Sequence, residues 1–124
     1  VVDDNPFILS AWINTLAADA TVHTVESLED LQAKLNADAK FLSRLSLVVT
    51  DMYLDGSAGN GLDVGRFIKQ NRPNLKVLLS SDGMFKNSDL VDAIDFVIGK
   101  DPVPFSKLEL VKMRSGIVGN QLPH

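Results

Sequence analysis

The stretch Leu45-Ser-Leu-Val-Val-Thr-Asp51 decides how the rest of the sequence is interpreted. It is a short apolar run that ends in one carboxylate, and the turn-forming segment 52–61 follows it. Such a run predicts a strand that is buried on both faces. Asp is disfavoured in strands and in cores, so Asp51 is either a turn residue or a residue held there for chemistry. Because ligands of open parallel sheets bind outside the carboxyl ends of the strands, we expect Asp51 to lie in that crevice.

The composition is that of one globular domain. The chain has 124 residues, of which 45% are hydrophobic and 23% charged, enough for a single core. A net charge of −4 argues against a nucleic-acid-binding surface on this chain. The lack of cysteine excludes a disulfide framework, a thiolate metal site and a Cys nucleophile, and is compatible with a reducing cytosol. We find no apolar run of membrane-spanning length and no signal peptide, and therefore expect a cytoplasmic protein without a membrane partner.

Strand and helix patterns alternate along the chain. Strands are predicted at 1–2, 21–25, 45–51, 75–79 and 96–98. Helices are predicted to begin near residues 5, 27, 62, 88 and 104, and the fourth of them is a short helix over 88–94. The segment up to Arg44 is either a longer helix or a loop. This alternation predicts an α/β fold with a parallel five-stranded sheet, doubly wound as (βα)5, and the flavodoxin-like order 2-1-3-4-5 is one of the few allowed. The first strand is short for a strand, so the N-terminus looks trimmed.

Polar side chains stand at the carboxyl ends of four predicted strands, namely Asp3, Asp4, Asp51, Ser80 and Lys100. In the order 2-1-3-4-5 the first and third strands are neighbours, so the three carboxylates would converge. Carboxylates a few ångström apart repel by roughly 4 kcal/mol per pair at an effective dielectric constant near 20, and a divalent cation would offset this. Oxygen ligands suit Mg²⁺, the hydroxyl and the ammonium can hold phosphate oxygens, and a carboxylate can accept a phosphoryl group. The pattern predicts a Mg²⁺-dependent phospho-aspartate site.

Nearly the whole chain resembles a bacterial response-regulator receiver domain. The matching motifs are Val-Val-Asp-Asp-Asn-Pro at 1–6, Leu-Val-Val-Thr-Asp-Met at 47–52, Gly-Leu-Asp-Val at 61–64, Val-Leu-Leu-Ser-Ser at 77–81 and Gly-Lys-Asp at 99–101. The resemblance implies a receiver domain over residues 1–118 and a tail over 119–124. It also implies a two-component signalling module, better called a switch than an enzyme, that catalyses only its own phosphorylation and dephosphorylation.

The resemblance assigns roles to the predicted site residues. Asp51 would accept a phosphoryl group from a histidine kinase or a histidine phosphotransferase. Asp3 or Asp4 would bind Mg²⁺ together with Asp51 and the backbone carbonyl of Tyr53. The implied output surface comprises the fourth helix, the fifth strand and the fifth helix, through which an output domain or a second copy of the chain would bind.

Two further roles follow from the same resemblance. Ser80 stands at the position of the switch hydroxyl, and Lys100 at the position of the phosphate-binding lysine. Phosphorylation of the acceptor would draw both groups in and shift the output surface between two packings.

The sequence departs from the family pattern at three places. Asp55 stands where the family usually has Pro, and the loop that follows needs about two extra residues. Asp101 follows the lysine position, where Pro is usual, as in receivers with LuxR-type DNA-binding outputs. Val97 holds the place of the family's switch aromatic and Phe96 is one residue off, so either the fifth strand has a bulge or the aromatic switch is altered.

Other interpretations stay open for the same residues. Asp3 and Asp4 could be turn and helix-start charges, which are favourable at a helix N-terminus. A degenerate receiver that acts only as a protein-interaction module is the main alternative function. A flavodoxin-like FMN carrier ranks last, and the glycines of segment 56–61 lack the Gly-Lys-Ser/Thr ending of a nucleotide-binding loop.

Overall fold

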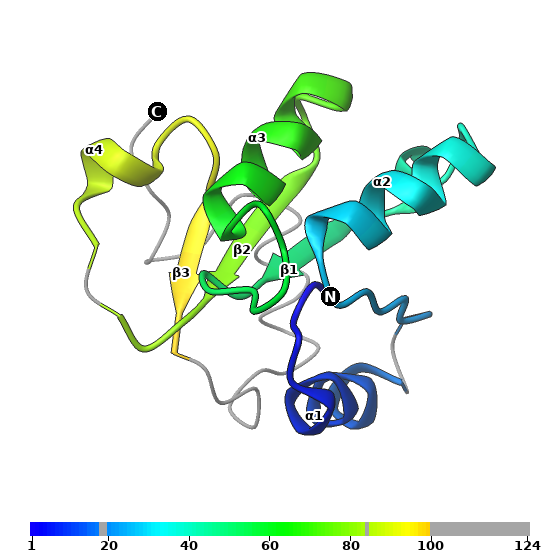
Figure 1. The fold of residues 1–124 in the computed structure, drawn as a ribbon, viewed down its shortest axis with the longest axis horizontal. Coiled ribbons are helices and arrows are strands. Elements are labelled where there is room, and N and C mark those ends of the chain that lie inside the picture. Colours follow the sequence, from blue (N-terminus) through cyan, green and yellow to red (C-terminus); the bar gives the residue numbers. More distant parts are fainter. Residues whose placement is uncertain (18–19, 84, 100–124) are drawn as a thin grey trace.

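The computed structural model describes residues 1–17, 20–83 and 85–99. From residue 47 onward, strands and helices alternate as the sequence predicts (Figure 1). In chain order they are α1 (Pro6–Leu16), α2 (Leu28–Ala37), the 3-10 helix η1 (Leu42–Arg44), β1 (Leu47–Thr50), α3 (Gly61–Asn71), β2 (Lys76–Ser80), α4 (Asn87–Leu90) and β3 (Phe96–Ile98). The helix expected from Pro104 and the tail 119–124 lie outside the described residues, so the domain boundary at residue 118 stays a prediction.

The sheet is parallel. Its three described strands lie in the order β1-β2-β3, with Val49 opposite Leu78 and Leu78 opposite Phe96. Val2 adds two isolated parallel bridges, one to Val25 and one to Thr50 of β1. The two predicted strands at 1–2 and 21–25 therefore appear in the described residues as bridges alone, because the ladder on both sides of Val2 extends over only a few residues.

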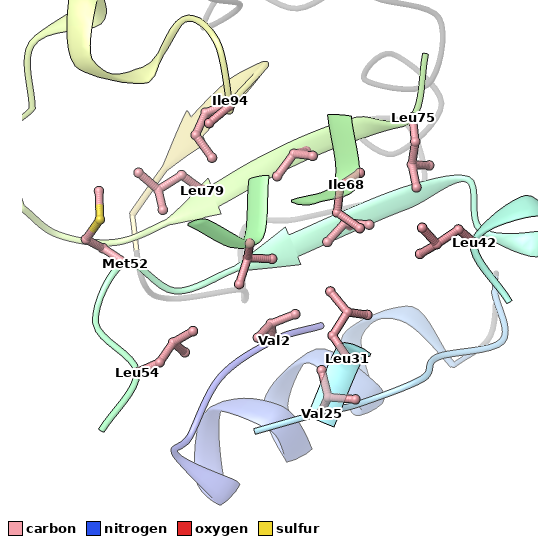
Figure 2. Packing of buried hydrophobic residues seen from close by; sticks show 14 of the residues in the cluster. Val2, Val25, Leu31, Leu42, Met52, Leu54, Ile68, Leu75, Leu79 and Ile94 are labelled. Atoms are coloured by element: carbon pink, nitrogen blue, oxygen red, sulfur yellow. The ribbon is translucent and has the colours of Figure 1, made fainter. Parts of the chain in front are cut away.

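Helices cover both faces of the sheet, as a doubly wound fold requires. Successive side chains of a strand point to opposite faces, and the buried residues of β1 and β2 divide accordingly. On one face Val48, Val77 and Leu79 belong to the larger core cluster, which includes residues of α2, α3 and α4 (Figure 2). On the other face Val49, Leu78 and Phe96 pack with Trp12 and Leu16 of α1, which Figure 1 shows set apart from α2 and α3.

The helix starts follow from capping. The side chain of Asn5 accepts a hydrogen bond from Phe7 N–H at 2.9 Å, and Ser27 Oγ accepts one from Asp30 N–H at 3.1 Å. Asn60 and Asp63 form a reciprocal capping box at the start of α3. All three caps place the helices directly after the loops at the carboxyl ends of the sheet.

Two boundaries differ from the sequence prediction. The helix expected over 88–94 ends at Leu90 and a turn follows it, in which Leu90 O accepts hydrogen bonds from Ala93 N–H and Ile94 N–H. Asp95 N–H already donates to Val77 O of β2, so the chain has joined the sheet by that residue. The ambiguous segment before β1 contains a single 3-10 turn. Arg72 fixes that turn by donating to the carbonyls of Leu42 and Leu45.

Among the residues that the structure describes, no helix combines the length and the apolar character needed to cross a membrane.

Candidate functional site

Three carboxylates converge at the carboxyl end of the sheet. Asp3 follows the bridging residue Val2, Asp4 precedes the start of α1, and Asp51 follows the last residue of β1. One carboxylate oxygen of each lies within 4.8 Å of the others. Residues almost fifty positions apart in the chain therefore share one place, as the predicted neighbourhood of the first and third strands requires.

Backbone N–H groups orient each of the three carboxylates. Asp3 Oδ1 accepts from Asn5 N–H at 2.9 Å, and Asp51 Oδ1 accepts from Met52 N–H at 2.8 Å. Asp4 Oδ2 accepts from Asp55 N–H at 3.1 Å, across 51 positions of sequence. Asp3 and Asp51 are buried, with 2% and 4% of their surface exposed. The cluster is therefore positioned by the main chain.

The donor set fits a hard divalent cation. Negative charges at these separations repel by roughly 4 kcal/mol per pair at an effective dielectric constant near 20, so uncompensated burial is costly. Only oxygen ligands are present in the cluster, and Asp4 keeps it partly open to solvent. Mg²⁺ prefers such oxygen ligands and keeps several waters, so Asp3, Asp4 and Asp51 could hold it.

A cleft of ≈ 460 Å³ opens over the cluster. It is lined by Asp4, Asn5, Asp51, Tyr53, Asp55, Ser81, Asp82 and Gly83. The side chain of Tyr53 is 66% exposed at its edge. The cleft therefore leads from solvent to Asp51.

The second serine of the strand exit, Ser81, lines this cleft, whereas Ser80 does not. Ser80 is buried, and its hydroxyl donates to the carbonyl of Gly99 at 3.1 Å. Ser81 Oγ accepts from Gly83 N–H at 3.4 Å. The sequence prediction assigned the hydroxyl role to Ser80 and no role to Ser81, although the alternation of side chains along a strand places two adjacent serines on opposite faces. The role of Ser80 as switch hydroxyl stays a prediction, and Lys100 lies outside the described residues.

β3 shows whether the fifth predicted strand has a bulge, which the sequence left open. Phe96 lies opposite Leu78 and Val97 opposite Leu79, in uninterrupted parallel register, so β3 has no bulge. Phe96 is fully buried against Trp12, on the α1 face of the sheet. Val97 packs against the other cluster, where an aromatic residue was expected from the family pattern. The altered aromatic position is therefore a property of this chain.

The fold matches solved receiver domains over almost the full length of the chain. The receiver domain of NtrX from Brucella abortus is 25% identical, with a TM-score of 0.69 and coverage of 94% of both chains. The BeF3-activated DrrB receiver domain is also 25% identical, with a TM-score of 0.68 and coverage of 94% of this chain and 92% of that one. This chain has the fold of a response-regulator receiver domain. The expected flavodoxin-like α/β class with a parallel sheet is thereby confirmed.

Further comparisons show how similar this chain is to other receivers and how much of their length it covers. The receiver domain of RcsB from Escherichia coli shares the fold at 20% identity, with a TM-score of 0.71 and coverage of 93% and 90%. The chain spans 26% of the longer NtrX chain from Brucella abortus, which it matches at 24% identity and a TM-score of 0.69 over 94% of its own length. No protein-family model matches the sequence, and no curated protein matches it.

Proposed function

We propose that this receiver domain is a phosphorylation-controlled switch of a two-component system and that Asp51 accepts the phosphoryl group. The observation that carries the proposal is the convergence of Asp3, Asp4 and Asp51 within 4.8 Å beneath an open cleft. The donor would be the phosphohistidine of a histidine kinase or a histidine phosphotransferase. Site and fold support the same function independently, since the geometry does not depend on the likeness to other receivers.

The proposed step is a displacement at phosphorus. A carboxylate oxygen of Asp51 forms the new P–O bond while the P–N bond of the donor breaks, and the electron pair of that bond stays on the imidazole. Met52 N–H, bonded to Asp51 Oδ1, restricts the rotation of the attacking carboxylate. The product is an acyl phosphate on Asp51, which water can hydrolyse to regenerate the carboxylate.

Asp3, Asp4 and Asp51, with the backbone carbonyl of Tyr53, are the residues that would hold Mg²⁺. Bound there, the ion would neutralise charge on the transferred phosphoryl group. Asn5 N–H and Asp55 N–H hold the carboxylates of Asp3 and Asp4 in place before any cation binds, which lowers the cost of assembling the site.

We further propose the five-stranded order 2-1-3-4-5 for the complete sheet. Its support is the parallel order β1-β2-β3 together with the position of Val2, which bridges to Val25 on one side and to Thr50 on the other. In that order the acceptor lies at the switch point between the first and third strands.

Phosphorylation of Asp51 would be transmitted to the output surface through the residues at the carboxyl ends of β2 and β3. Ser80 must exchange its hydrogen bond to Gly99 O for a phosphoryl oxygen, which would move the end of β3. We propose that Lys100 pairs with the same phosphoryl group, and that α4, β3 and the helix expected from Pro104 form the surface for an output domain or a second copy of the chain. We also propose a cytoplasmic location, since the kinase partner acts there.

The decisive experiment is phosphorylation by acetyl phosphate with Mg²⁺, followed by intact-mass measurement. We expect the gain of one phosphoryl group in the native chain and none in Asp51→Asn. The matched control is Asp55→Asn, because Asp55 is an exposed carboxylate of the same cleft and its backbone N–H is retained. No mass gain in the native chain, or an equal gain in Asp51→Asn, would refute the proposal. A Mg²⁺ titration in the presence of BeF3⁻, the group that activates the DrrB receiver, gives a second test of the proposed site.

One observation favours the alternative of a receiver that acts only as a protein-interaction module. Val97 replaces the expected aromatic and packs inward, so a switch that relies on a mobile ring at that position is absent. This alternative predicts equal partner binding by the native chain and by Asp51→Ala, and no measurable Mg²⁺ affinity.

A further inference from the structure

Residues 52–60, the loop between Asp51 and α3, are held at two points by segments that are distant in sequence. Near the start of the loop, the backbone N–H of Asp55 donates to Asp4 Oδ2 at 3.1 Å. Further along, the loop donates two hydrogen bonds to the carboxylate of Glu29, in the first turn of α2. The first contact orients a member of the acidic cluster, and the second connects the same loop to a helix that contributes no residue to that cluster.

The contact with Glu29 is bidentate. Ser57 Oγ–H donates to Oε2 and Ala58 N–H donates to Oε1, each at 2.8 Å. Hydrogen bonds to an ionised carboxylate are roughly twice as strong as those between neutral groups. Ser57 Oγ in turn accepts from Leu28 N–H at 3.4 Å and from Gly59 N–H at 3.3 Å. Two adjacent residues of the loop are therefore fixed against the start of α2.

A closed β-turn joins the two contacts. Ser57 N–H donates to Leu54 O at 3.1 Å, so Asp55 and Gly56 are the central residues of the turn 54–57. Gly56 has a φ of +76°, at the position where a type II turn requires a positive value. Leu54 is buried in the larger core cluster. A displacement of Ser57 would therefore also displace Asp55, since no flexible chain lies between them.

Of the three clustered carboxylates, that of Asp4 depends most on this loop. Asp3 and Asp51 are buried, and each accepts a hydrogen bond from an N–H group one or two residues further along the chain. Asp4 is only partly buried and accepts from Asp55 N–H, 51 positions away. A movement of the loop would therefore change the orientation of Asp4 before that of the other two.

We propose that Glu29 is a positioning residue of the candidate site. By holding the turn 54–57, Glu29 keeps Asp55 N–H in place to orient the Asp4 carboxylate within the acidic cluster. Glu29 is not among the described residues that line the cleft, so it acts on the site only through the loop. The consequence for Mg²⁺ rests on the proposed function, whereas the placement of Asp55 by Glu29 does not.

The test compares three variants with the native chain, at a temperature where all four are folded. Glu29→Ala removes both acceptor oxygens, whereas Glu29→Gln keeps one carbonyl oxygen for Ala58 N–H. Glu26→Ala is the matched control, because Glu26 is an exposed carboxylate just before α2. A purely structural role of Glu29 would lower stability and leave the acidic cluster unchanged.

Hydrogen exchange of the Asp55 amide in the metal-free chain is the first measurement. We expect Glu29→Ala to speed this exchange about fivefold, the effect of losing one net hydrogen bond. Glu29→Gln should restore part of the protection, and Glu26→Ala should leave it at the native level. Equal protection of the Asp55 amide in Glu29→Ala and in the native chain would overturn the proposal.

Titration calorimetry with Mg²⁺ is the second measurement. We expect the dissociation constant of Glu29→Ala to rise about fivefold, and that of Glu29→Gln to rise less. At saturating Mg²⁺ the rate of phosphorylation by acetyl phosphate should return to the native value, because Asp51 itself has not moved. Faster exchange of the Asp55 amide with unchanged Mg²⁺ affinity would overturn the positioning role. If the native chain binds no Mg²⁺, the proposed function fails, and the exchange measurement still decides whether Glu29 places Asp55.

Discussion

Asp4 and Asp55, 51 positions apart, are joined by a hydrogen bond of 3.1 Å from the backbone N–H of Asp55 to Asp4 Oδ2. The bond connects the start of α1 to the loop after β1, and both residues line the same cleft as Asp51. Receivers usually have Pro at this loop position, and Pro lacks the N–H that makes the bond. The departure from the family pattern at Asp55 thus supplies a contact that orients a carboxylate of the candidate metal site.

This contact predicts opposite behaviour of two substitutions at one position. Asp55→Ala keeps the backbone N–H, whereas Asp55→Pro removes it. We expect Asp55→Pro to lower the free energy of unfolding by about 1 kcal/mol more than Asp55→Ala, the net value of one hydrogen bond. Urea unfolding followed by the fluorescence of the buried Trp12 measures this difference. The difference should disappear in an Asp4→Ala background; if it persists there, the bond to Asp4 is not its cause.

A second prediction concerns the glycines of α3. A Cβ on Gly61 would lie 2.2 Å from Asp51 O, and a Cβ on Gly65 would lie 2.3 Å from Ala93 O. Both Gly61→Ala and Gly65→Ala should therefore force the backbone apart and cost about 1–3 kcal/mol of stability.

Only the first of these contacts involves the site. We expect Gly61→Ala to weaken Mg²⁺ binding and slow phosphorylation by acetyl phosphate, because it displaces the backbone of Asp51. Gly65→Ala is the matched control, with a similar loss of stability and an unchanged site. Similar Mg²⁺ affinities of the two variants at a temperature where both are folded would contradict the prediction.

The sequence predicts the three described strands and the acidic cluster well because both depend on local patterns. Apolar runs at 45–51 and 75–79 identify β1 and β2, and a carboxylate at the end of such a run is unfavourable enough to point to function. The β3 prediction, 96–98, coincides with Phe96–Ile98. The three carboxylates could be placed together because a parallel sheet brings the ends of its strands to one edge.

The parts that the sequence could not predict depend on contacts between distant segments. α4 ends early where the chain joins the sheet through the hydrogen bond from Asp95 N–H to Val77 O, and nothing in residues 91–94 signals that turn. The choice between Ser80 and Ser81 at the cleft depends on which face of β2 each occupies. The longer loop after Asp51 is accommodated by α2, whose first turn holds it through a side chain that no motif singled out.

That side chain is Glu29, and it gives a prediction with a pH dependence. Its carboxylate accepts from Ala58 N–H and from Ser57 Oγ–H, each at 2.8 Å. The Ala58 N–H, then the backbone N–H of Glu29 itself and the Ser57 hydroxyl, hold the pKa of this carboxyl below its ordinary value of 4.5. A depressed folded-state pKa means that the stabilisation is complete above about pH 4.5 and is lost as the pH falls through the lower, folded value.

We therefore expect Glu29→Gln to lower Tm modestly at pH 7, with a deficit relative to the native chain that stays constant down to about pH 5 and shrinks in stronger acid. Glu26→Gln is the control, since this neighbouring carboxylate is exposed. Thermal unfolding followed across pH 3–7 gives the curve. A deficit that grows with acidity would show that the bonds to the loop do not favour the ionised form.

The last prediction concerns the ion pair between Lys69 of α3 and Asp95, the residue before β3. Lys69 Nζ of α3 donates to Asp95 Oδ2 at 2.5 Å and to Leu75 O at 2.8 Å, and Val77 N–H donates to the same Asp95 oxygen at 2.8 Å. The side chain of Asp95 is 4% exposed and that of Lys69 is 19% exposed. The pair therefore connects α3, the start of β2 and the residue before β3 within the core.

Removing Lys69 and removing Asp95 should lower the free energy of unfolding by different amounts. Lys69→Met leaves the Asp95 charge buried without its cation, and we expect a loss of about 3 kcal/mol in the free energy of unfolding. Asp95→Asn keeps an acceptor for Val77 N–H, and the remaining ammonium can turn toward solvent, so we expect a smaller loss. Lys76→Met, a partly buried lysine on β2, is the control for loss of a charge alone. Equal stabilities of Lys69→Met and Lys76→Met in urea unfolding would show that the buried pair does not hold α3 to the sheet.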